Sequence, residues 1–240
     1  MESVFAWESS YLAPVLTIGL TTICFIAYWY IAKSETVRNN YIKKYGEEMT
    51  KVYYIIFQKY TGVLFLGILP TIIVLIFLPF KLSEYGLNLN NSLTTLYWIL
   101  GLGILIFVMN FFAARKPENY KIYPQIRIKE WPPKFVVINA ITWICYLFAY
   151  EFLFRGILLF ACIPALGIWP AIAVNTTIYS CTHMLKSRKE AIAAIPFGII
   201  LCIITISTGN IWTAFFAHVF LALTNDYFSL YYNPDMKVVK

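Results

Sequence analysis

Residues 135–161 read FVVINAITWICYLFAYEFLFRGILLFA, a long apolar run that contains one glutamate and one arginine. A helix needs about 20 apolar residues to cross the hydrocarbon core of a bilayer, so this run is long enough to span a membrane. The whole chain shares this character, because 60% of its 240 residues are hydrophobic and only 13% are charged. Soluble domains contain roughly 45–50% apolar and 25% charged residues, so the composition indicates a membrane protein.

Seven segments have the length and apolar character of membrane-spanning helices. They are 11–32, 60–80, 93–113, 135–161, 169–185, 190–207 and 210–232. The predicted fold is therefore all-α, a polytopic membrane helix bundle of about seven transmembrane helices. The five cysteines lie in or beside these segments and form no C-x-x-C pair, so they are interpreted as small core residues.

The basic residues are distributed unevenly between the predicted loops. Of the nineteen lysines and arginines, seventeen fall in alternate loops on one side, Lys81 falls on the other side, and Arg155 lies within a span. Because basic loops stay in the cytoplasm, we expect the N-terminus outside and the C-terminus inside a bacterial cytoplasmic membrane. This distribution accounts for the net charge of +7, so no nucleic-acid partner is expected.

Segment 33–59 combines apolar and charged residues in a helical pattern. Its large apolar side chains recur every three or four residues, with lysine and glutamate between them, and they are Tyr41, Tyr45, Met49, Val52, Tyr53 and Ile56. This periodicity predicts an amphipathic helix that lies along the inner leaflet, with the lipid bilayer as its partner. The alternative is a helix that packs against another loop.

Glu151 and Arg155 are the charged residues of the long apolar run, and each is costly to bury. On insertion scales, a charge at the bilayer centre costs roughly 2.5–3.5 kcal/mol. The two residues are four apart, so they share one helix face and can form an ion pair. Pairing explains how the charges are tolerated, but it does not explain why they are present.

The only two histidines of the chain lie in two further predicted spans, and each belongs to a polar stripe on one helix face. The stripes are Asn175, Tyr179 and His183 on one helix, and His218, Asn225 and Asp226 on the other. A single histidine in a membrane helix can equally serve as a hydrogen-bonding contact between helices. Two histidines together with the Glu–Arg pair favour one shared polar site.

Three short motifs on successive spans resemble those of a known family. They are YEFLFR at 150–155, YSCTH at 179–183 and HVFLA at 218–222. These segments are similar to the E-E-x-x-x-R, F-x-x-x-H and H-x-x-x-N motifs of the CAAX protease and bacteriocin-processing (CPBP, or Abi) intramembrane proteases. The order of the motifs also fits this family.

The resemblance divides the chain into three parts. Residues 1–114 are expected to form N-terminal transmembrane helices, with the amphipathic segment 33–59 among them. Residues 115–232 are expected to form a CPBP-like core, and residues 233–240 a cytoplasmic tail.

Members of this family are proposed to hydrolyse peptide bonds within the membrane, with a glutamate that activates water and histidines that assist it. The resemblance therefore implies an intramembrane endopeptidase that acts on a peptide or a lipidated protein. No cofactor or metal is expected from the sequence. It implies Glu151, His183 and His218 as catalytic residues. The supporting residues that it implies are Arg155, Tyr150, Tyr179, Asn175 and Asn225.

Two motif positions depart from the family pattern. Tyr150 stands where the family has its first glutamate, and Ala222 stands where it has asparagine. A pseudoprotease that binds a membrane partner or peptide is therefore a second hypothesis, and a small transporter or proton relay is a third. A zinc site of His183, His218 and Glu151 is a fourth, although the chain lacks the short H-E-x-x-H spacing.

Overall fold

The computed structural model describes residues 6–120, 122–185 and 187–239, and within them it is a helix bundle with one two-stranded pair. The first part of the chain forms η1 (Ser9–Tyr11), α1 (Leu12–Ala32), α2 (Glu35–Gly62), η2 (Val63–Ile68), α3 (Leu69–Phe77), α4 (Ser92–Ala113) and α5 (Pro117–Tyr120). The second part forms β1 (Glu130–Trp131), α6 (Pro133–Glu151), η3 (Phe152–Leu158), α7 (Leu159–Leu166), α8 (Ile168–Met184), α9 (Arg188–Thr208), α10 (Trp212–Tyr232) and β2 (Lys237–Val238). This architecture confirms the predicted all-α fold class.

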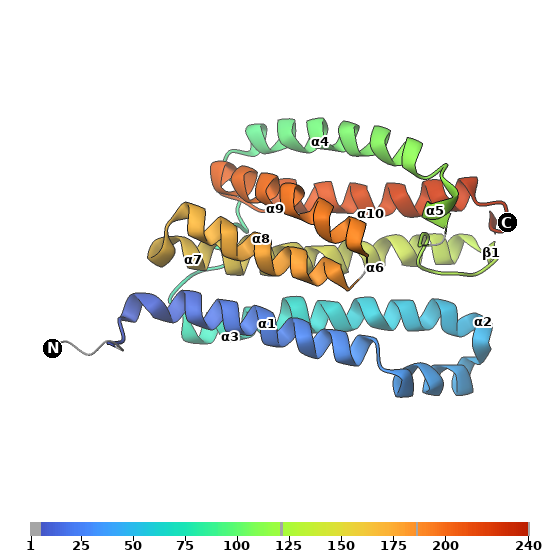
Figure 1. Ribbon diagram of the computed structural model, residues 1–240, viewed down its shortest axis with the longest axis horizontal. Helices are drawn as coiled ribbons and strands as arrows, with labels where there is room; N and C mark the ends of the chain where they lie inside the picture. Colours follow the sequence, from blue (N-terminus) through green and yellow to red (C-terminus); the bar gives the residue numbers. More distant parts are fainter. Residues whose placement is uncertain (1–5, 121, 186, 240) are drawn as a thin grey trace.

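The long helices lie side by side along the longest axis of the molecule (Figure 1). The continuous segment of α6, η3 and α7 runs through the middle, where α6 contacts α2 on one side and α10 on the other. Helix α8 packs against α9, and α4 covers α10 from outside. The short parallel strands β1 and β2 join the segment before α6 to the C-terminal segment. The middle of the bundle therefore receives side chains from α6, η3, α8 and α10.

The η3 segment is a π-helix, and all seven of its residues are buried. A π-helical turn is wider than an α-helical turn and leaves backbone groups that need partners from elsewhere. Asn175 of α8 supplies one such partner, because its Nδ2 donates to the Phe154 carbonyl at 2.5 Å. The turn that carries Arg155 is therefore connected to α8 by a buried side chain.

Helix α2 differs from the surface helix that the sequence predicts over 33–59. Its backbone bends at Gly46, where φ is 74° and ψ is 167°, a conformation that residues with a Cβ rarely adopt. Beyond the bend the helix carries buried residues, among them Val52, Tyr54 and Lys59, and contacts α6. The part after Gly46 therefore belongs to the bundle, and the part before it packs back on this second arm through Tyr41, whose ring lies 6.0 Å from that of Tyr54. The position of the first part along the inner leaflet stays a prediction.

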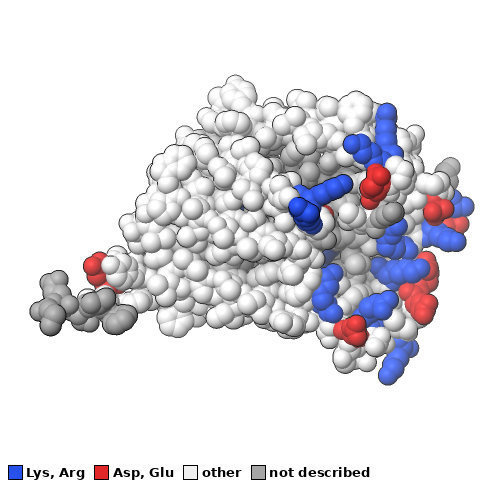
Figure 2. Space-filling view, in the orientation of Figure 1, with Lys and Arg blue, Asp and Glu red and all other residues white. Residues whose placement is uncertain are grey.

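Four segments of the described chain are long and apolar enough to cross a membrane, and they are Ser9–Phe77, Ser92–Ala113, Pro133–Leu166 and Arg188–Thr208. The first contains two legs, α1 and the α2–α3 segment, which run in opposite directions in Figure 1. The count of seven spans stays a prediction. Figure 2 shows lysine and arginine side chains gathered at one end of the bundle, the end where α5 and β1 lie.

Candidate functional site

The three motif helices meet around Glu151, the last residue of α6. Its Oε1 lies 2.5 Å from Nδ1 of His218 on α10. Its Oε2 lies 3.4 Å from Nη1 of Arg155 on η3, a distance typical of an ion pair rather than a well-formed hydrogen bond. Glu151 and Arg155 are fully buried, and His218 is 7% exposed. The carboxylate therefore faces two groups that can carry positive charge.

Arg155 is held between the carboxylate and an aromatic ring. Its guanidinium carbon lies 4.1 Å from the centroid of the Tyr179 ring on α8. Such a cation–π contact contributes about 2 kcal/mol or more when both groups are desolvated. Glu151 and Tyr179 together offset the cost of burying this arginine in the middle of the bundle.

His183 lies beside His218. Their rings are nearly parallel, with an interplanar angle of 16° and centroids 6.5 Å apart. Nδ1 of His183 lies 3.0 Å from the carbonyl oxygen of Tyr179, one helical turn earlier on α8. This contact fixes the orientation of the His183 ring, because the carbonyl can accept only from a protonated Nδ1.

The Tyr150 ring lies close to both histidine rings, and its hydroxyl contacts α8. Its ring centroid lies 5.8 Å from that of His218 and 6.3 Å from that of His183. Its hydroxyl lies 2.8 Å from Oγ1 of Thr182. The structure thus brings together Tyr150, Glu151, Arg155, Tyr179, His183 and His218.

Asn175 and Asn225 have partners outside this group. Asn175 supports η3 through the Phe154 carbonyl, and its Oδ1 accepts the Cys202 thiol at 3.2 Å. Asn225 accepts a 2.9 Å hydrogen bond from Asn119 of α5. The structure therefore assigns these two asparagines structural contacts and does not bring Asn225 to the histidines.

Two residues that contact the site were not identified from the sequence. Thr182 contacts the Tyr150 hydroxyl and also donates to the Tyr179 carbonyl at 2.7 Å. The ring of Phe197 of α9 is nearly perpendicular to the His218 ring, with centroids 5.9 Å apart. Thr182 precedes His183 in the second motif and could have been considered, whereas no sequence signal distinguishes Phe197 from other apolar residues of α9.

Asp226 does not join the histidines, although the sequence placed it on the His218 face. Its Oδ2 accepts from Asn139 at 3.0 Å and from the Trp143 indole at 2.7 Å. Asn139 in turn accepts from Lys59 at 2.9 Å, and the Lys59 ammonium lies 4.0 Å from a Trp143 ring centroid. These four buried residues form a second polar cluster, the Asp226 cluster, which joins α2, α6 and α10.

The donor set for the zinc hypothesis is incomplete. Among residues 6–120, 122–185 and 187–239, no three His, Cys, Asp or Glu side chains lie close enough together to hold a metal ion. Glu151 already contacts Arg155 and His218 with its two oxygens, so this arrangement does not offer it as a metal ligand. The residues therefore do not fit a His₂Glu zinc site.

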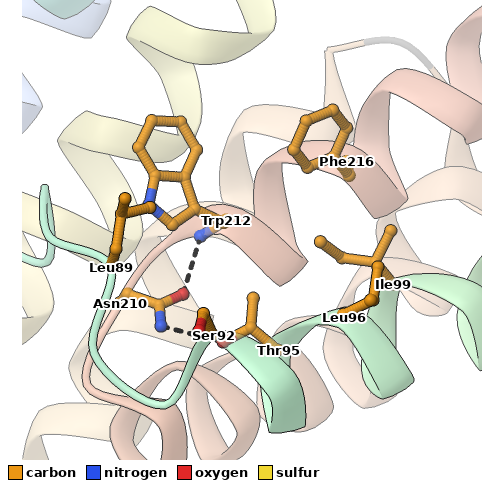
Figure 3. A pocket seen from close by; sticks show the side chains of 8 residues that line it. All are labelled: Leu89, Ser92, Thr95, Leu96, Ile99, Asn210, Trp212 and Phe216. Carbon is orange, nitrogen blue, oxygen red and sulfur yellow. Dashed lines mark hydrogen bonds between the residues drawn. The ribbon is translucent and has the colours of Figure 1, made fainter.

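Two pockets in the described structure lie away from Glu151 and the histidines. The first has a volume of about 310 Å³ and lies between the first turns of α4 and α10, among apolar side chains such as Trp212 and Phe216 (Figure 3). Asn210 supports its wall through a 2.9 Å hydrogen bond to Thr95. The second, of about 290 Å³, lies between α2 and the segment before β1. Neither pocket is lined by a residue of the three motifs.

Residues 132–224 match the protein family described as Type II CAAX prenyl endopeptidase Rce1-like. The match covers all three motifs and confirms the resemblance to the CPBP and CAAX proteases. Together with the long apolar helices, the match supports an integral membrane protein that is similar to the CAAX proteases over residues 132–224. No curated protein and no solved structure matched the chain.

Proposed function

We propose that the chain is an intramembrane endopeptidase of the CAAX type that activates water through the pair of Glu151 and His218. The observation that carries this proposal is the 2.5 Å contact between Glu151 Oε1 and His218 Nδ1 within the family core. Burying Glu151 and Arg155 in an apolar bundle is costly, and apolar residues of similar size would often stabilise the helices as well. A catalytic role explains why the charges are present.

In the proposed mechanism, His218 is the general base. An ionised Glu151 accepts a hydrogen bond from Nδ1–H, which leaves the lone pair of the ring on Nε2. Nε2 takes a proton from water as the water oxygen attacks the carbonyl carbon of the scissile peptide bond. The imidazolium, stabilised by Glu151, then gives this proton to the leaving amine as the C–N bond breaks. Arg155 balances the charge of Glu151 and holds its carboxylate in place.

In this proposal, His183 and Tyr150 donate hydrogen bonds to the developing oxyanion. His183 can donate from Nε2–H when both of its nitrogens are protonated, because its Nδ1 already faces the Tyr179 carbonyl. Tyr150 is the second donor, and its hydroxyl proton must turn to the oxyanion from Thr182 Oγ1, which itself donates to the Tyr179 carbonyl. Each correctly placed donor contributes about 3–4 kcal/mol to such a transition state.

A pseudoprotease is the second candidate, and a specific observation favours it. Tyr150 fills the position of the family's first glutamate, and its hydroxyl contacts Thr182. His183 and His218 are each 7% exposed, so a substrate needs the helices to move apart before it can reach them. On this second proposal the same space binds a membrane partner or peptide without cleaving it.

The orientation in the membrane is also proposed from charge. The basic end of the bundle in Figure 2 is placed in the cytoplasm, with the N-terminus outside, in a bacterial cytoplasmic membrane. The substrate class is a peptide or lipidated protein whose cleavable segment enters from the bilayer.

The test is cleavage of a peptide library by the purified full-length protein in detergent, with and without a chelator. Cleavage that resists chelation and disappears in His218→Ala supports the proposed enzyme. Absence of cleavage by a folded protein that still binds peptides from the library supports the pseudoprotease. Cleavage that chelation abolishes contradicts the metal-free mechanism.

A further inference from the structure

The bend at Gly46 shapes a pocket at the basic end of the bundle, far in the sequence from the three motifs. The pocket has a volume of about 290 Å³ and is formed by both arms of α2 and by the segment that precedes β1. It is lined by Arg38, Ile42, Glu47, Thr50, Lys51, Tyr54, Ile55, Gln125 and Arg127. Residues from separate segments therefore enclose one space.

The two arms of α2 are fixed relative to each other by side-chain contacts. The Tyr54 hydroxyl donates to the Ser34 carbonyl at 3.2 Å, across the bend, and the rings of Tyr41 and Tyr54 lie 6.0 Å apart. The Thr50 hydroxyl donates to the Gly46 carbonyl at 2.7 Å. These contacts fix the two arms of α2 relative to each other, so the shape of the pocket is determined by the fold.

The lining is strongly basic. Arg38, Lys51 and Arg127 carry positive charge, and Glu47 is the one acidic side chain among the residues that line this pocket. Lys51 already pairs with Glu48 at 2.5 Å. Arg127 donates to the carbonyl oxygens of Tyr123 and Pro124, at 3.1 and 3.5 Å, and forms no ion pair with an acidic side chain among the described residues.

We propose that this pocket binds the phosphate of an anionic phospholipid headgroup. Arginine forms short, charge-assisted and often bidentate hydrogen bonds to phosphate. Arg38 of α2 and Arg127 of the segment before β1 both line the pocket and provide this group. Thr50, Tyr54 and Gln125 supply neutral polar groups for the rest of a headgroup.

The position of the pocket favours a lipid over a free phosphate. Beyond the pocket, α2 continues directly into η2 and α3, the apolar end of the candidate membrane segment Ser9–Phe77. Ile42 and Ile55 provide apolar walls beside the basic groups, which suits the boundary between a headgroup and its acyl chains. Anionic lipids attract basic groups at this boundary by about 1 kcal/mol for each lysine or arginine.

The test uses the full-length protein in a neutral detergent and native mass spectrometry with phosphatidylglycerol or phosphatidylcholine. The informative variant is Arg38→Gln/Arg127→Gln. Its matched control is Lys43→Gln/Lys129→Gln, which removes the same charge from the same two segments without touching the pocket lining. We expect phosphatidylglycerol to bind the parent protein more tightly than phosphatidylcholine. The arginine variant should lose about tenfold or more in affinity, and the control less than about threefold.

Three outcomes would overturn the proposal. Equal weakening in both double variants would show a response to overall charge, and equal affinity for the two lipids would show that the headgroup charge is not recognised. Binding of inorganic phosphate as tight as that of phosphatidylglycerol would show a site for a soluble anion.

If Arg38→Gln/Arg127→Gln does not fold, the single variant Arg38→Gln replaces it, because the Arg38 side chain is exposed. That variant should still weaken phosphatidylglycerol binding more than Lys43→Gln does.

Discussion

The Glu151 carboxylate and the His218 imidazole lie 2.5 Å apart in the middle of the bundle, although 67 residues separate them in the chain. Glu151 ends α6, and His218 lies in the second turn of α10. Arg155 contacts the other carboxylate oxygen at 3.4 Å. The geometry is that of an oriented imidazole, with an acid behind it and a cation that balances the acid. This arrangement suits a base that must be neutral before the reaction and charged during it.

Substitution of Glu151 by glutamine should destabilise the protein as well as abolish activity. The change leaves Arg155 fully buried without its ion-pair partner and leaves His218 facing an amide. Removal of one partner from a buried ion pair costs roughly 3–5 kcal/mol. The measurement is the unfolding midpoint of the purified protein in detergent.

The matched control is Glu130→Gln, which removes the same charge from an exposed pair with Lys237. This change should alter the free energy of unfolding by less than about 1 kcal/mol. The ion-pair interpretation fails if Glu151→Gln is as stable as this control while Arg155 remains charged.

Replacement of either histidine by alanine should abolish peptide cleavage. His218 is the proposed base and His183 the proposed donor to the oxyanion, and each such role contributes on the order of 10²–10⁴ in rate. The rate of cleavage of a library-derived peptide is the measurement, and Phe197→Leu is a control that changes only the ring packed against His218. Retention of the parent rate in His218→Ala would remove it from the mechanism.

Restoration of the family residues distinguishes an enzyme from a pseudoprotease. Tyr150→Glu/Ala222→Asn introduces the carboxylate and the amide that the family motifs contain. If the natural chain is an active endopeptidase, the parent protein cleaves peptides without these two substitutions. Cleavage that appears only in the double variant would identify the natural chain as a pseudoprotease.

The sequence predicts the positions of the helices well because the apolar length of a segment is a local property. The segment 169–185, for example, corresponds to α8 at Ile168–Met184. The spacing of Glu151 and Arg155 also predicts their pairing, since both lie on one helix. The contact between Glu151 and His218 depends on how two helices are rotated against each other, and no local pattern contains this information.

The same limit explains the residues that the sequence misplaced. Asn225 and Asp226 share a face with His218 by periodicity, but the structure pairs them with Asn119 and with the Asp226 cluster. A helix face in a bundle contacts different neighbours along its length, so residues on one face can serve separate sites. The bend of α2 was missed because the periodicity of 33–59 continues on both sides of Gly46.

The orientation of the chain can be tested with reporters. A reporter fused after Lys240 should be active only in a form that works in the cytoplasm, because seventeen of the nineteen basic residues are expected on that side. A second fusion in the loop between α3 and α4 should give the opposite result, since this loop contains Lys81 as its only basic residue. Activity of a periplasmic reporter after Lys240 would reverse the proposed orientation.

The Asp226 cluster should stabilise the contact of α2 with α6 and α10. Asn139 connects Asp226 of α10 to Lys59 of α2, and Trp143 contacts both charged groups. Asp226→Ala removes the acid and leaves Lys59 buried without a negative group in this cluster. We therefore expect a loss of roughly 3–5 kcal/mol in the free energy of unfolding.

A double-mutant cycle tests whether this loss comes from the charge or from packing. Lys59→Met/Asp226→Leu replaces both charged residues with apolar side chains, and such a replacement of a buried pair is often neutral or stabilising. The single variants of the cycle are Lys59→Met and Asp226→Leu. We expect the double variant to recover most of the stability that Asp226→Leu loses, with a coupling energy of about 1–3 kcal/mol. Asp235→Ala, which changes an exposed aspartate beyond the end of α10, is the control. If Asp226→Ala is as stable as this control, Lys59 does not depend on Asp226, and another contact must join α2 to the core.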